Sequence, residues 1–400
     1  MTRASGCSEG LFSHDQVRMD LLKERAYNQR WAMQPADVIP LTAADPDFPV
    51  APEIREAVKR YADGGVFSYG PPEGLPKFKR TVAEVMAERK GLRCTPELIL
   101  PTDGAASAMF LIARTFCQPG DEVIIFDPVD FLFGEAVDAA GARRVYSHVD
   151  KMTGEFDLHG LEDLVTPRTR MICVCNPHNP LGRVMTRSEL EAIGSLGVKH
   201  DLVIMSDEIW SDIVYPPAEH VSMGSLDDEI AGRTVSVFGF SKTFGIAGLR
   251  IGFVVAPTTE WYQRLADASL VRTTAAGATT VSQIAAAAAY EDCWYWVEAF
   301  LKHLEAVRDY AVERLDGFAG VRCREPEGTY VLFPDITGLG MSSTEVAELI
   351  LERGRVAVVP GLPRWLGPGA EGNIRLCYST SLELMREGLD RIELALDGIV

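Results

Sequence analysis

The segment GFSKTFGIAGLRIGF, residues 239–253, is the most informative part of this chain of 400 residues for both its fold and its chemistry. It follows the apolar, β-branched run 234–238, which predicts a buried strand. Lys242 comes just after that strand, and Arg250 follows eight residues later among glycines. A desolvated lysine near other cations has a lowered pKa, which makes its amine a nucleophile toward an aldehyde. Arg250 is suited to neutralise a phosphate dianion.

Short β-branched runs alternate with helix-like segments through the first three quarters of the chain. The runs lie at 122–126, 170–174, 202–206, 234–238 and 251–255. Continuously apolar strands that alternate with helices predict an α/β fold with a mostly parallel sheet between helices. In such sheets ligands bind at the carboxyl ends of strands, and polar clusters follow the second, third and fourth of these runs.

A second, smaller domain is predicted at the C-terminus. From about residue 291 the chain has helical spacing without proline or glycine for more than six turns, which predicts a long helix that links two domains. Strands near 329–333, 355–359 and 373–378 and helices at 343–353 and 382–396 follow it. We expect a large domain over 46–290 and a small α+β domain formed by 1–45 and 291–400, with the N-terminal arm folded back.

Composition excludes several classes of partner. The formal net charge of −18 repels nucleic acid and anionic membranes, whose binding begins with phosphate neutralisation. No apolar run is long enough to span a membrane, and the first sixteen residues lack a signal-peptide core. The eight cysteines are scattered, so we expect reduced thiols, and the histidines lack metal-ligand spacing, so we expect no metal. A soluble, cytoplasmic enzyme is expected.

Three motifs together carry a family resemblance. SKTFGIAGLRIGF (241–253), CNPHNPLGRV (175–184) and SDEIWSDIVY (206–215) resemble the lysine, asparagine-loop and aspartate motifs of fold-type I enzymes that depend on pyridoxal 5′-phosphate (PLP). Their order and spacing resemble the class I/II aminotransferase superfamily over about 40–390. The resemblance implies PLP bound as a Schiff base on Lys242, and amino acids and keto acids as substrates.

The resemblance also implies which residues contact the cofactor ring. Asp207 pairs with the pyridine nitrogen and keeps it protonated, so that the ring accepts electrons from a bond broken at the substrate Cα. Asn179 donates its amide to the phenolate oxygen of the ring. Taken alone, Asp207 also suits a helix N-cap, and NPHNP (176–180) also suits a turn.

The cofactor phosphate is expected near TDGAASAM (102–109). There Ala105 and Ala106 open a helix, and a helix N-terminus offers free N–H groups and a favourable dipole to an anion. Tight packing explains the small residues equally well. Ser241 and Arg250 are the other phosphate ligands that the resemblance implies.

Further residues are placed by resemblance at the substrate and at a subunit interface. Arg375 in EGNIRLCYST (371–380) resembles the arginine that binds the substrate α-carboxylate, for which a planar guanidinium is suited. LTAADPDF (41–48) resembles the substrate loop, with Ala44 in backbone contact with the substrate. Tyr69 in FSYGPPEG would reach the phosphate of the neighbouring subunit, which implies a homodimer with shared active sites.

Three positions depart from the family pattern. Gly239 stands where many relatives have a hydroxyl residue that binds the phosphate. Trp210 stands where transaminating relatives have a tyrosine, and an indole N–H can only donate. Asp130 aligns with the aromatic residue expected to stack on the ring, so Phe131 beside it is the candidate stacking partner.

These departures leave several functions open. An aminotransferase is the leading hypothesis. CNPHNPLGRV and DEIWSD also resemble the carbon–sulfur β-lyase branch of the superfamily, which gives a β-eliminating lyase as the alternative. A specialised biosynthetic PLP enzyme is the third. A PLP-sensing regulator is disfavoured because about forty residues precede the catalytic part without a helix-turn-helix pattern. A nucleotide-binding protein is disfavoured because neither GxGxxG after a strand nor GxxxxGK[ST] occurs.

Overall fold

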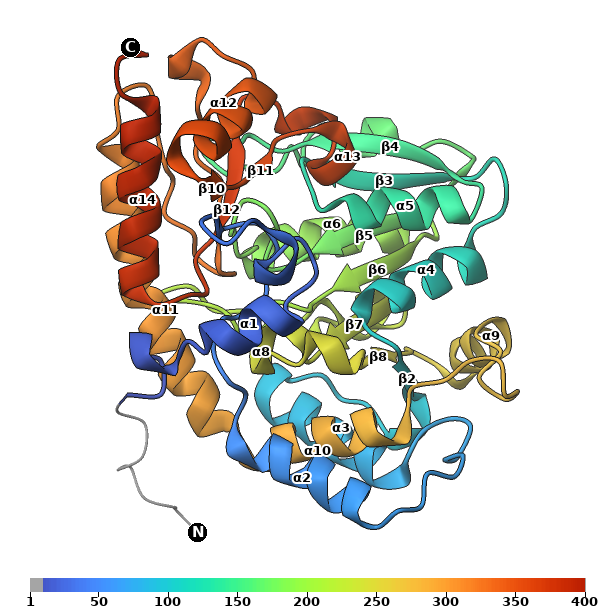
Figure 1. Cartoon of the computed structure of the whole chain (residues 1–400). Coiled ribbons are helices and arrows are strands. Elements are labelled where there is room, and N and C mark those ends of the chain that lie inside the picture. The colour runs from blue at the N-terminus through green and yellow to red at the C-terminus, as the bar shows by residue number, and fades with distance from the viewer. Residues whose placement is uncertain (1–9, 400) are drawn as a thin grey trace.

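A twisted sheet forms the centre of the molecule in the computed structural model, which describes residues 10–399 (Figure 1). Within that range the sheet has seven strands in the order β2-β8-β7-β6-β5-β3-β4. Their bounds are β2 Ile99–Thr102, β3 Glu122–Asp127, β4 Arg143–His148, β5 Thr169–Cys175, β6 Val203–Asp207, β7 Thr234–Gly239 and β8 Gly252–Val255. Only β8 runs antiparallel to its neighbours, β2 and β7. The predicted α/β fold with a mostly parallel sheet is confirmed.

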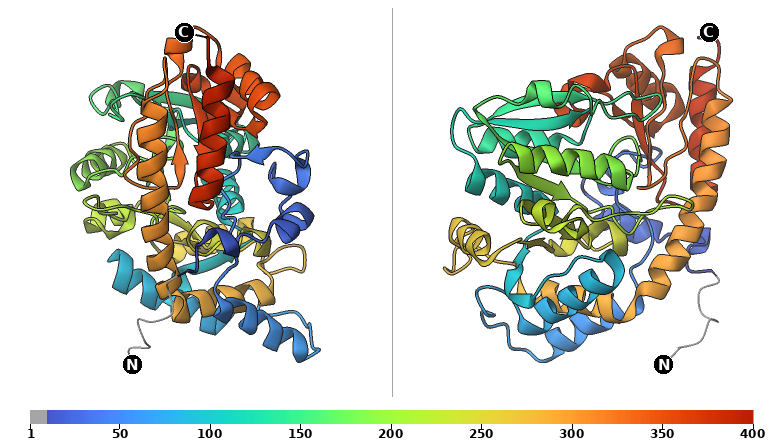
Figure 2. Two further views of the ribbon diagram at one scale, coloured as in Figure 1. Left: turned by 60° about the vertical axis from the view of Figure 1, so that its left-hand side comes forward. Right: turned by 180° about the vertical axis from the view of Figure 1, so that it is seen from behind.

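Helices cover both faces of this sheet because successive strand residues point to opposite sides. On one face Ile125 and Cys173 pack with α4 (Ala105–Phe116), α5 (Phe131–Ala139) and α9 (Thr259–Ala268). On the other face Ile124 and Ile172 pack with α6 (Arg187–Lys199) and α7 (Asp228–Ala231). Figure 1 shows α4 and α5 in front of the sheet, and the right-hand view of Figure 2 shows α6 from behind.

A third helical layer closes the β2 end of the sheet. It consists of α2 (Pro52–Asp63), α3 (Pro76–Lys90) and α10 (Thr280–Asp292), at the bottom of Figure 1. Phe78 of α3 packs its ring 6.0 Å from Phe240 and 6.3 Å from Phe253, measured between ring centroids. This aromatic cluster supports the turn that follows β7, where Lys242 lies.

The long helix α11 (Trp294–Asp316) runs along one side of the molecule, as the left-hand view of Figure 2 shows. The prediction that this helix starts near 291 is wrong by three residues. Residues 291 and 292 end α10, and the chain turns at Cys293, whose backbone N–H still donates to Ala289. The long helix itself is confirmed.

Beyond α11, the C-terminal part contains two small sheets. β9 (Val331–Leu332), β11 (Val359–Pro360) and β12 (Ile374–Cys377) pair antiparallel, and β1 (Ile39–Pro40) pairs parallel with β10 (Val356–Ala357). The strand predicted over 355–359 is therefore two strands in different sheets. The pairing of β1 with β10 confirms that the N-terminal arm, which includes α1 (Met19–Arg25), folds back.

Three helices complete the C-terminal part. They are α12 (Ser343–Leu349), α13 (Pro363–Leu366) and α14 (Leu382–Leu396). The helix predicted over 343–353 ends at Leu349 and continues as one π-helical turn, Ile350–Gly354. The helix predicted at 382–396 is confirmed at both ends.

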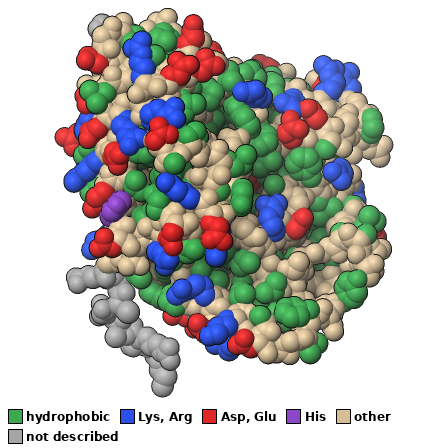
Figure 3. Space-filling model, in the orientation of Figure 1, with side chains coloured by type: hydrophobic (Ala, Val, Ile, Leu, Met, Phe, Trp, Pro, Cys, Tyr) green, Lys and Arg blue, Asp and Glu red, His purple; other side chains and the backbone are tan. Residues whose placement is uncertain are grey.

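The described residues were also compared with the features of membrane-spanning segments, metal sites, disulfides and basic surface patches. Within residues 10–399, no helix combines the length and the hydropathy of a membrane-spanning segment. Over the same range, no three His, Cys, Asp or Glu side chains are grouped as a metal site, and the cysteines from Cys94 to Cys377 are free thiols. On the face drawn in Figure 3, basic and acidic side chains are interspersed rather than gathered into one basic patch.

Candidate active site

A cavity of about 300 Å³ lies where the carboxyl ends of the central strands meet the N-termini of α4 and α5. The last residues of β5 and β6 line it, as do the first residues after β7. The cavity wall contains most of the site residues predicted from the sequence: Ala44, Ala105, Ala106, Phe131, Asn179, Asp207, Trp210, Ser241, Lys242, Arg250 and Arg375. The structure therefore brings eleven of the twelve predicted site residues together.

Lys242 lies in the short helix α8 (Ser241–Phe244), which begins two residues after β7 ends. Its Nζ donates a hydrogen bond of 2.6 Å to the carbonyl oxygen of Ala44 and lies 5.1 Å from the centroid of the Trp210 ring. Burial lowers the pKa of Lys242, although the charges of Asp45 and Asp130 oppose that shift. A lowered pKa makes the neutral, nucleophilic amine more accessible near neutral pH.

Asp207 ends β6, and its side chain faces the same cavity with little exposure to solvent. Its Oδ1 accepts a hydrogen bond of 3.1 Å from the backbone N–H of Ile209. Burial raises the pKa of Asp207 to about 7 because the charged form loses its hydration. A protonated pyridine nitrogen would supply the positive partner that such a carboxylate requires, so the residue fits the cofactor ring.

An anion site lies at the N-terminus of α4. Gly104 caps this helix with a φ of 116°, a conformation that glycine adopts without strain. A Cβ built there would lie 3.3 Å from Nη2 of Arg250, so the guanidinium stands against the first helical turn. Within residues 10–399, Arg250 has no ion-pair partner. A guanidinium and free helical N–H groups at one place suit a phosphate group.

Asn179, Asp130 and Arg375 form one polar cluster on the cavity wall. Nδ2 of Asn179 donates to Oδ2 of Asp130 at 2.9 Å, and Oδ1 of Asn179 accepts from Nη1 of Arg375 at 3.2 Å. Nη2 of Arg375 donates to the Thr42 carbonyl at 3.4 Å. Its buried Nε has no hydrogen-bond partner in the described part of the chain. A carboxylate ligand would satisfy that buried donor.

The structure shows what surrounds Gly239, Trp210 and Phe131, which stand at or beside the positions that depart from the family pattern. A Cβ at Gly239 would collide with Cδ1 of Ile209, so this isoleucine fills the space that a hydroxyl side chain would need. Trp210 is buried and packs edge-on against Tyr330, with 4.6 Å between ring centroids. Phe131 packs edge-on against Trp365 at 5.8 Å.

Tyr69 is the predicted site residue that the cavity does not include. It lies in the loop between α2 and α3, at the lower right of Figure 1, and its side chain is 88% exposed. No other part of the described chain covers it. Its predicted role depends on a neighbouring subunit.

The contribution of residues 28–30 to the site was not predicted from the sequence. Asn28 and Gln29 line the cavity. Behind them, the buried Arg30 donates to the Pro40 and Ala43 carbonyls at 3.0 and 3.2 Å, and to Asp47. The segment reads NQRW among polar residues, a pattern that gives no sign of burial.

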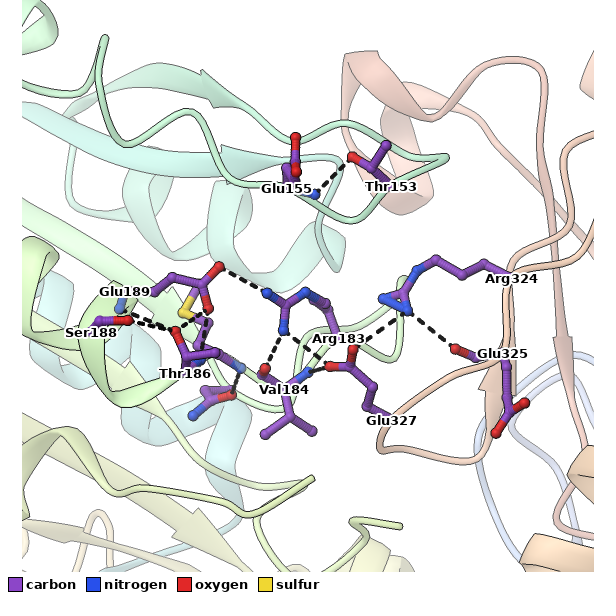
Figure 4. Close-up of polar contacts among 12 residues, drawn as sticks. Thr153, Glu155, Arg183, Val184, Thr186, Ser188, Glu189, Arg324, Glu325 and Glu327 are labelled. Atoms are coloured by element: carbon purple, nitrogen blue, oxygen red, sulfur yellow. Dashed lines mark hydrogen bonds and ion pairs between the residues drawn. The ribbon is translucent and has the colours of Figure 1, made fainter. Parts of the chain in front are cut away.

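His178 and Arg183, the residues of the asparagine loop that resemble the β-lyase branch, make contacts outside the cavity. His178 is buried, with its ring 5.4 Å from that of Phe156. Arg183 bridges Glu189 at 2.8 Å and Glu327 at 3.0 Å, and so links this loop to the C-terminal part (Figure 4). Since neither His178 nor Arg183 lines the cavity, these two residues do not distinguish a lyase from an aminotransferase.

Comparisons with known proteins agree with this geometry. The family model for aminotransferase class I and II matches residues 36–392. An aspartate aminotransferase of Pyrococcus abyssi is 34% identical, with 89% of this chain and 91% of that protein covered. The cystathionine β-lyase PatB of Bacillus subtilis is 32% identical, with 90% and 93% covered.

Solved structures give the same result. A PLP-bound putative aminotransferase from Clostridium difficile superposes with a TM-score of 0.87 at 28% identity, covering 94% of this chain and 98% of that one. Cystalysin from Treponema denticola, which contains PLP, superposes with a TM-score of 0.88 at 26% identity and the same coverage. The chain therefore belongs to the aminotransferase class I and II family and is a PLP-dependent transferase of fold type I.

Proposed function

We propose that this enzyme transfers the amino group between an amino acid and a keto acid, and that Lys242 carries its PLP. The observation that carries the proposal is the buried amine of Lys242 in one cavity with the carboxylate of Asp207 and the guanidinium of Arg375. The similarity to the aspartate aminotransferase of Pyrococcus abyssi supports it.

Each proposed role follows from the local chemistry of a side chain. PLP, when bound, withdraws electrons from the substrate Cα. Asp207 holds the positive charge of the ring nitrogen, while Arg375 binds the substrate carboxylate. Lys242, in its neutral form, accepts the Cα proton, and its contact with the Ala44 carbonyl orients the amine. The residues proposed to contact the cofactor are Lys242, Asp207, Asn179, Arg250, Ser241, Ala105, Ala106, Tyr69, Trp210 and Phe131, and those for the substrate are Arg375 and Ala44.

We further propose a cytoplasmic homodimer with shared active sites. Val66, Phe67 and Tyr69 are each more than two-thirds exposed and lie on one loop. Apolar side chains grouped in this way are typical of a surface that another chain covers. Free thiols are compatible with a reducing compartment.

A β-lyase acting on a cysteine-type substrate is the second candidate. The observation that favours it is Trp210, whose indole cannot accept a hydrogen bond or ionise as a phenol does. PatB and cystalysin are relatives of this chain as well. Lys242, Asp207 and Arg375 would have the same tasks in the first steps of either reaction.

The test is a reconstitution experiment. The PLP-loaded protein is mixed with single amino acids, with and without a keto acid, while absorbance and products are followed. Transfer requires the keto acid, whereas elimination releases pyruvate and sulfide from cysteine or cystathionine without one. Borohydride reduction should label Lys242, and Lys242→Ala should abolish turnover. Lys199→Ala, on the exposed side of α6, is the matched control. Turnover by Lys242→Ala would contradict the proposal.

A further inference from the structure

Asp130 lies where the family pattern expects an aromatic ring, and the main chain holds it firmly. It caps α5, with Oδ1 accepting a hydrogen bond of 3.1 Å from the backbone N–H of Leu132. Its own backbone N–H donates to the Asn179 carbonyl at 3.1 Å. The remaining oxygen, Oδ2, accepts from Nδ2 of Asn179 at 2.9 Å. Asp130 therefore holds Asn179 through both its main chain and its side chain.

The amide of Asn179 is thereby fixed in one orientation. Its nitrogen faces the carboxylate of Asp130, and its oxygen faces the guanidinium of Arg375. A rotation that exchanged the two ends would bring donor against donor and acceptor against acceptor. One N–H of the amide remains for another acceptor. Nη1 of Arg375 also lies 3.8 Å from Oδ2 of Asp130, so all three groups form one charged cluster.

We propose that Asp130 is a positioning residue: its carboxylate orients Asn179 and Arg375 and places a negative charge on the wall of the cavity that contains Lys242. The inference rests on the proposed attachment of PLP to Lys242. A tyrosine or tryptophan at this position would supply no negative charge near neutral pH.

The charge argument follows from the low polarity of the cavity. A negative charge near a cation in a poorly hydrated site stabilises the cation more than it would in water. Burial lowers the pKa of Lys242, and Asp45 and then Asp130 raise it. The other ionisable groups around these two side chains are Asp207, Arg375, Cys175 and Cys377.

Asp130→Asn is the direct test, because asparagine has nearly the same shape and also caps helices well. It removes the charge and the acceptor facing Asn179. The readout is a pH titration of the visible absorbance of bound PLP without substrate, which does not depend on turnover. We expect the midpoint to fall by about one pH unit or more. Asp130→Ser, which keeps a helix cap, should lower it as well.

The matched control is Glu135→Gln, which removes one negative charge from the exposed side of the same helix. Its midpoint should equal that of the wild type. An unchanged midpoint in both Asp130 variants, or an equal shift in Glu135→Gln, would overturn the inference.

A double variant tests whether Asp130 acts through Asn179. In an Asn179→Ala background, the shift caused by Asp130→Asn should be smaller than in the wild type, since part of the effect passes through the amide. Full additivity of the two shifts would overturn the positioning role. If PLP gave the wild type no visible band at all, the proposed function would fail instead.

Discussion

Residue Asp207 combines a proposed role in PLP binding with a cost in stability. Burial raises its pKa to about 7, so the folded protein without PLP binds this proton more tightly than the unfolded chain does. Stability then decreases as the pH rises from about 4, the pKa of an unfolded aspartate, to about 7, and it stays low above that. Binding of a positively charged ring nitrogen would remove the penalty.

Asp207→Asn should therefore stabilise the PLP-free protein while weakening PLP binding. Asparagine keeps the acceptor for the Ile209 N–H but cannot ionise. We expect a gain on the order of a few kcal/mol above pH 7 that shrinks steadily toward pH 4. Thermal unfolding of both PLP-free proteins across this range measures it. A gain independent of pH would show that the charge is not responsible.

The neighbouring Glu208 provides the control. Burial raises its pKa to about 7 as well, but its carboxylate receives hydrogen bonds from Ser206 and Ser222 and does not line the cavity. Glu208→Gln should change the pH dependence of stability in the same direction and leave PLP affinity near that of the wild type. Equal loss of PLP by both variants would mean that the Asp207 effect is structural.

The buried pair Arg30–Asp47 is a second residue-scale feature. Nη2 of Arg30 donates to Oδ1 of Asp47 at 2.5 Å, and the indole of Trp31 donates to the same oxygen at 2.8 Å. The loop between them presents the Ala44 carbonyl to Lys242 and the Thr42 carbonyl to Arg375. The pair therefore fixes two backbone contacts of the site.

Single substitutions of this pair should be more harmful than the double one. Arg30→Met or Asp47→Leu leaves one buried charge unpaired, which costs about 3–5 kcal/mol, whereas the double variant leaves none. Urea unfolding of the three variants measures the difference. Additive losses would show that the two charges do not interact. Arg18→Met, at an exposed ion pair with Asp20, is the control and should change stability by less than about 1 kcal/mol.

From the sequence, residues of the cavity wall were predicted where a motif carries them, whereas contacts between residues far apart in the chain were missed. Asp207 ends the apolar strand β6 and Lys242 follows the end of β7 by three residues, so the fold alone brings both to the same edge of the sheet. The contact of Asp130 with Asn179 joins residues 49 positions apart. Arg30 was missed because its partners are carbonyl groups and one carboxylate across a loop, which leave no periodic signal.

At the scale of elements, strands were found where they are continuously apolar and missed where they are not. β4 lies at the edge of the sheet and reads RRVYSH, largely polar and partly exposed. β2 contains Pro101, a residue that argues against a strand. The antiparallel direction of β8 was also not predictable, because apolar runs carry no information on direction.

A contact between the end of β7 and the residues that follow β6 leads to a prediction on packing. Gly239 ends β7, and Cδ1 of Ile209 fills the adjacent space. Gly239→Ser alone should destabilise the protein by about 1–3 kcal/mol through overpacking. Ile209→Val removes the colliding methyl group, so the double variant should recover most of that loss. Thermal unfolding measures both, and no recovery would place the strain elsewhere.

At the scale of the whole molecule, the α/β architecture followed from the alternation of strands and helices. The division into 46–290 and 1–45 with 291–400 stays a prediction. The Arg183–Glu327 bridge and the bonds from the Glu327 and Gly328 N–H groups to the Gly182 carbonyl join the two proposed parts (Figure 4). If one part moved relative to the other, these contacts would either break or move together with both parts.

The exposed loop between α2 and α3 leads to a prediction on assembly. Phe67→Asp places a charge among exposed apolar side chains and should convert the proposed dimer into monomers, because a buried unpaired charge is unfavourable. Sedimentation measures the mass. Leu394→Asp, at an exposed position of α14, is the control and should leave the mass unchanged. A wild-type protein that is monomeric would contradict the prediction.

Complementation tests whether two chains share each active site. Lys242→Ala lacks the proposed PLP lysine, and Tyr69→Ala lacks the tyrosine proposed to reach the phosphate of its neighbour, so each variant alone should be nearly inactive. In a mixed dimer, one site has both defects, and the other combines Lys242 of one chain with Tyr69 of its partner. Unfolding and refolding an equal mixture should restore about a quarter of wild-type activity, because half the dimers are mixed and each has one intact site. No recovery, with mixed dimers verified by an affinity tag on one variant, would show that Tyr69 serves its own chain or none.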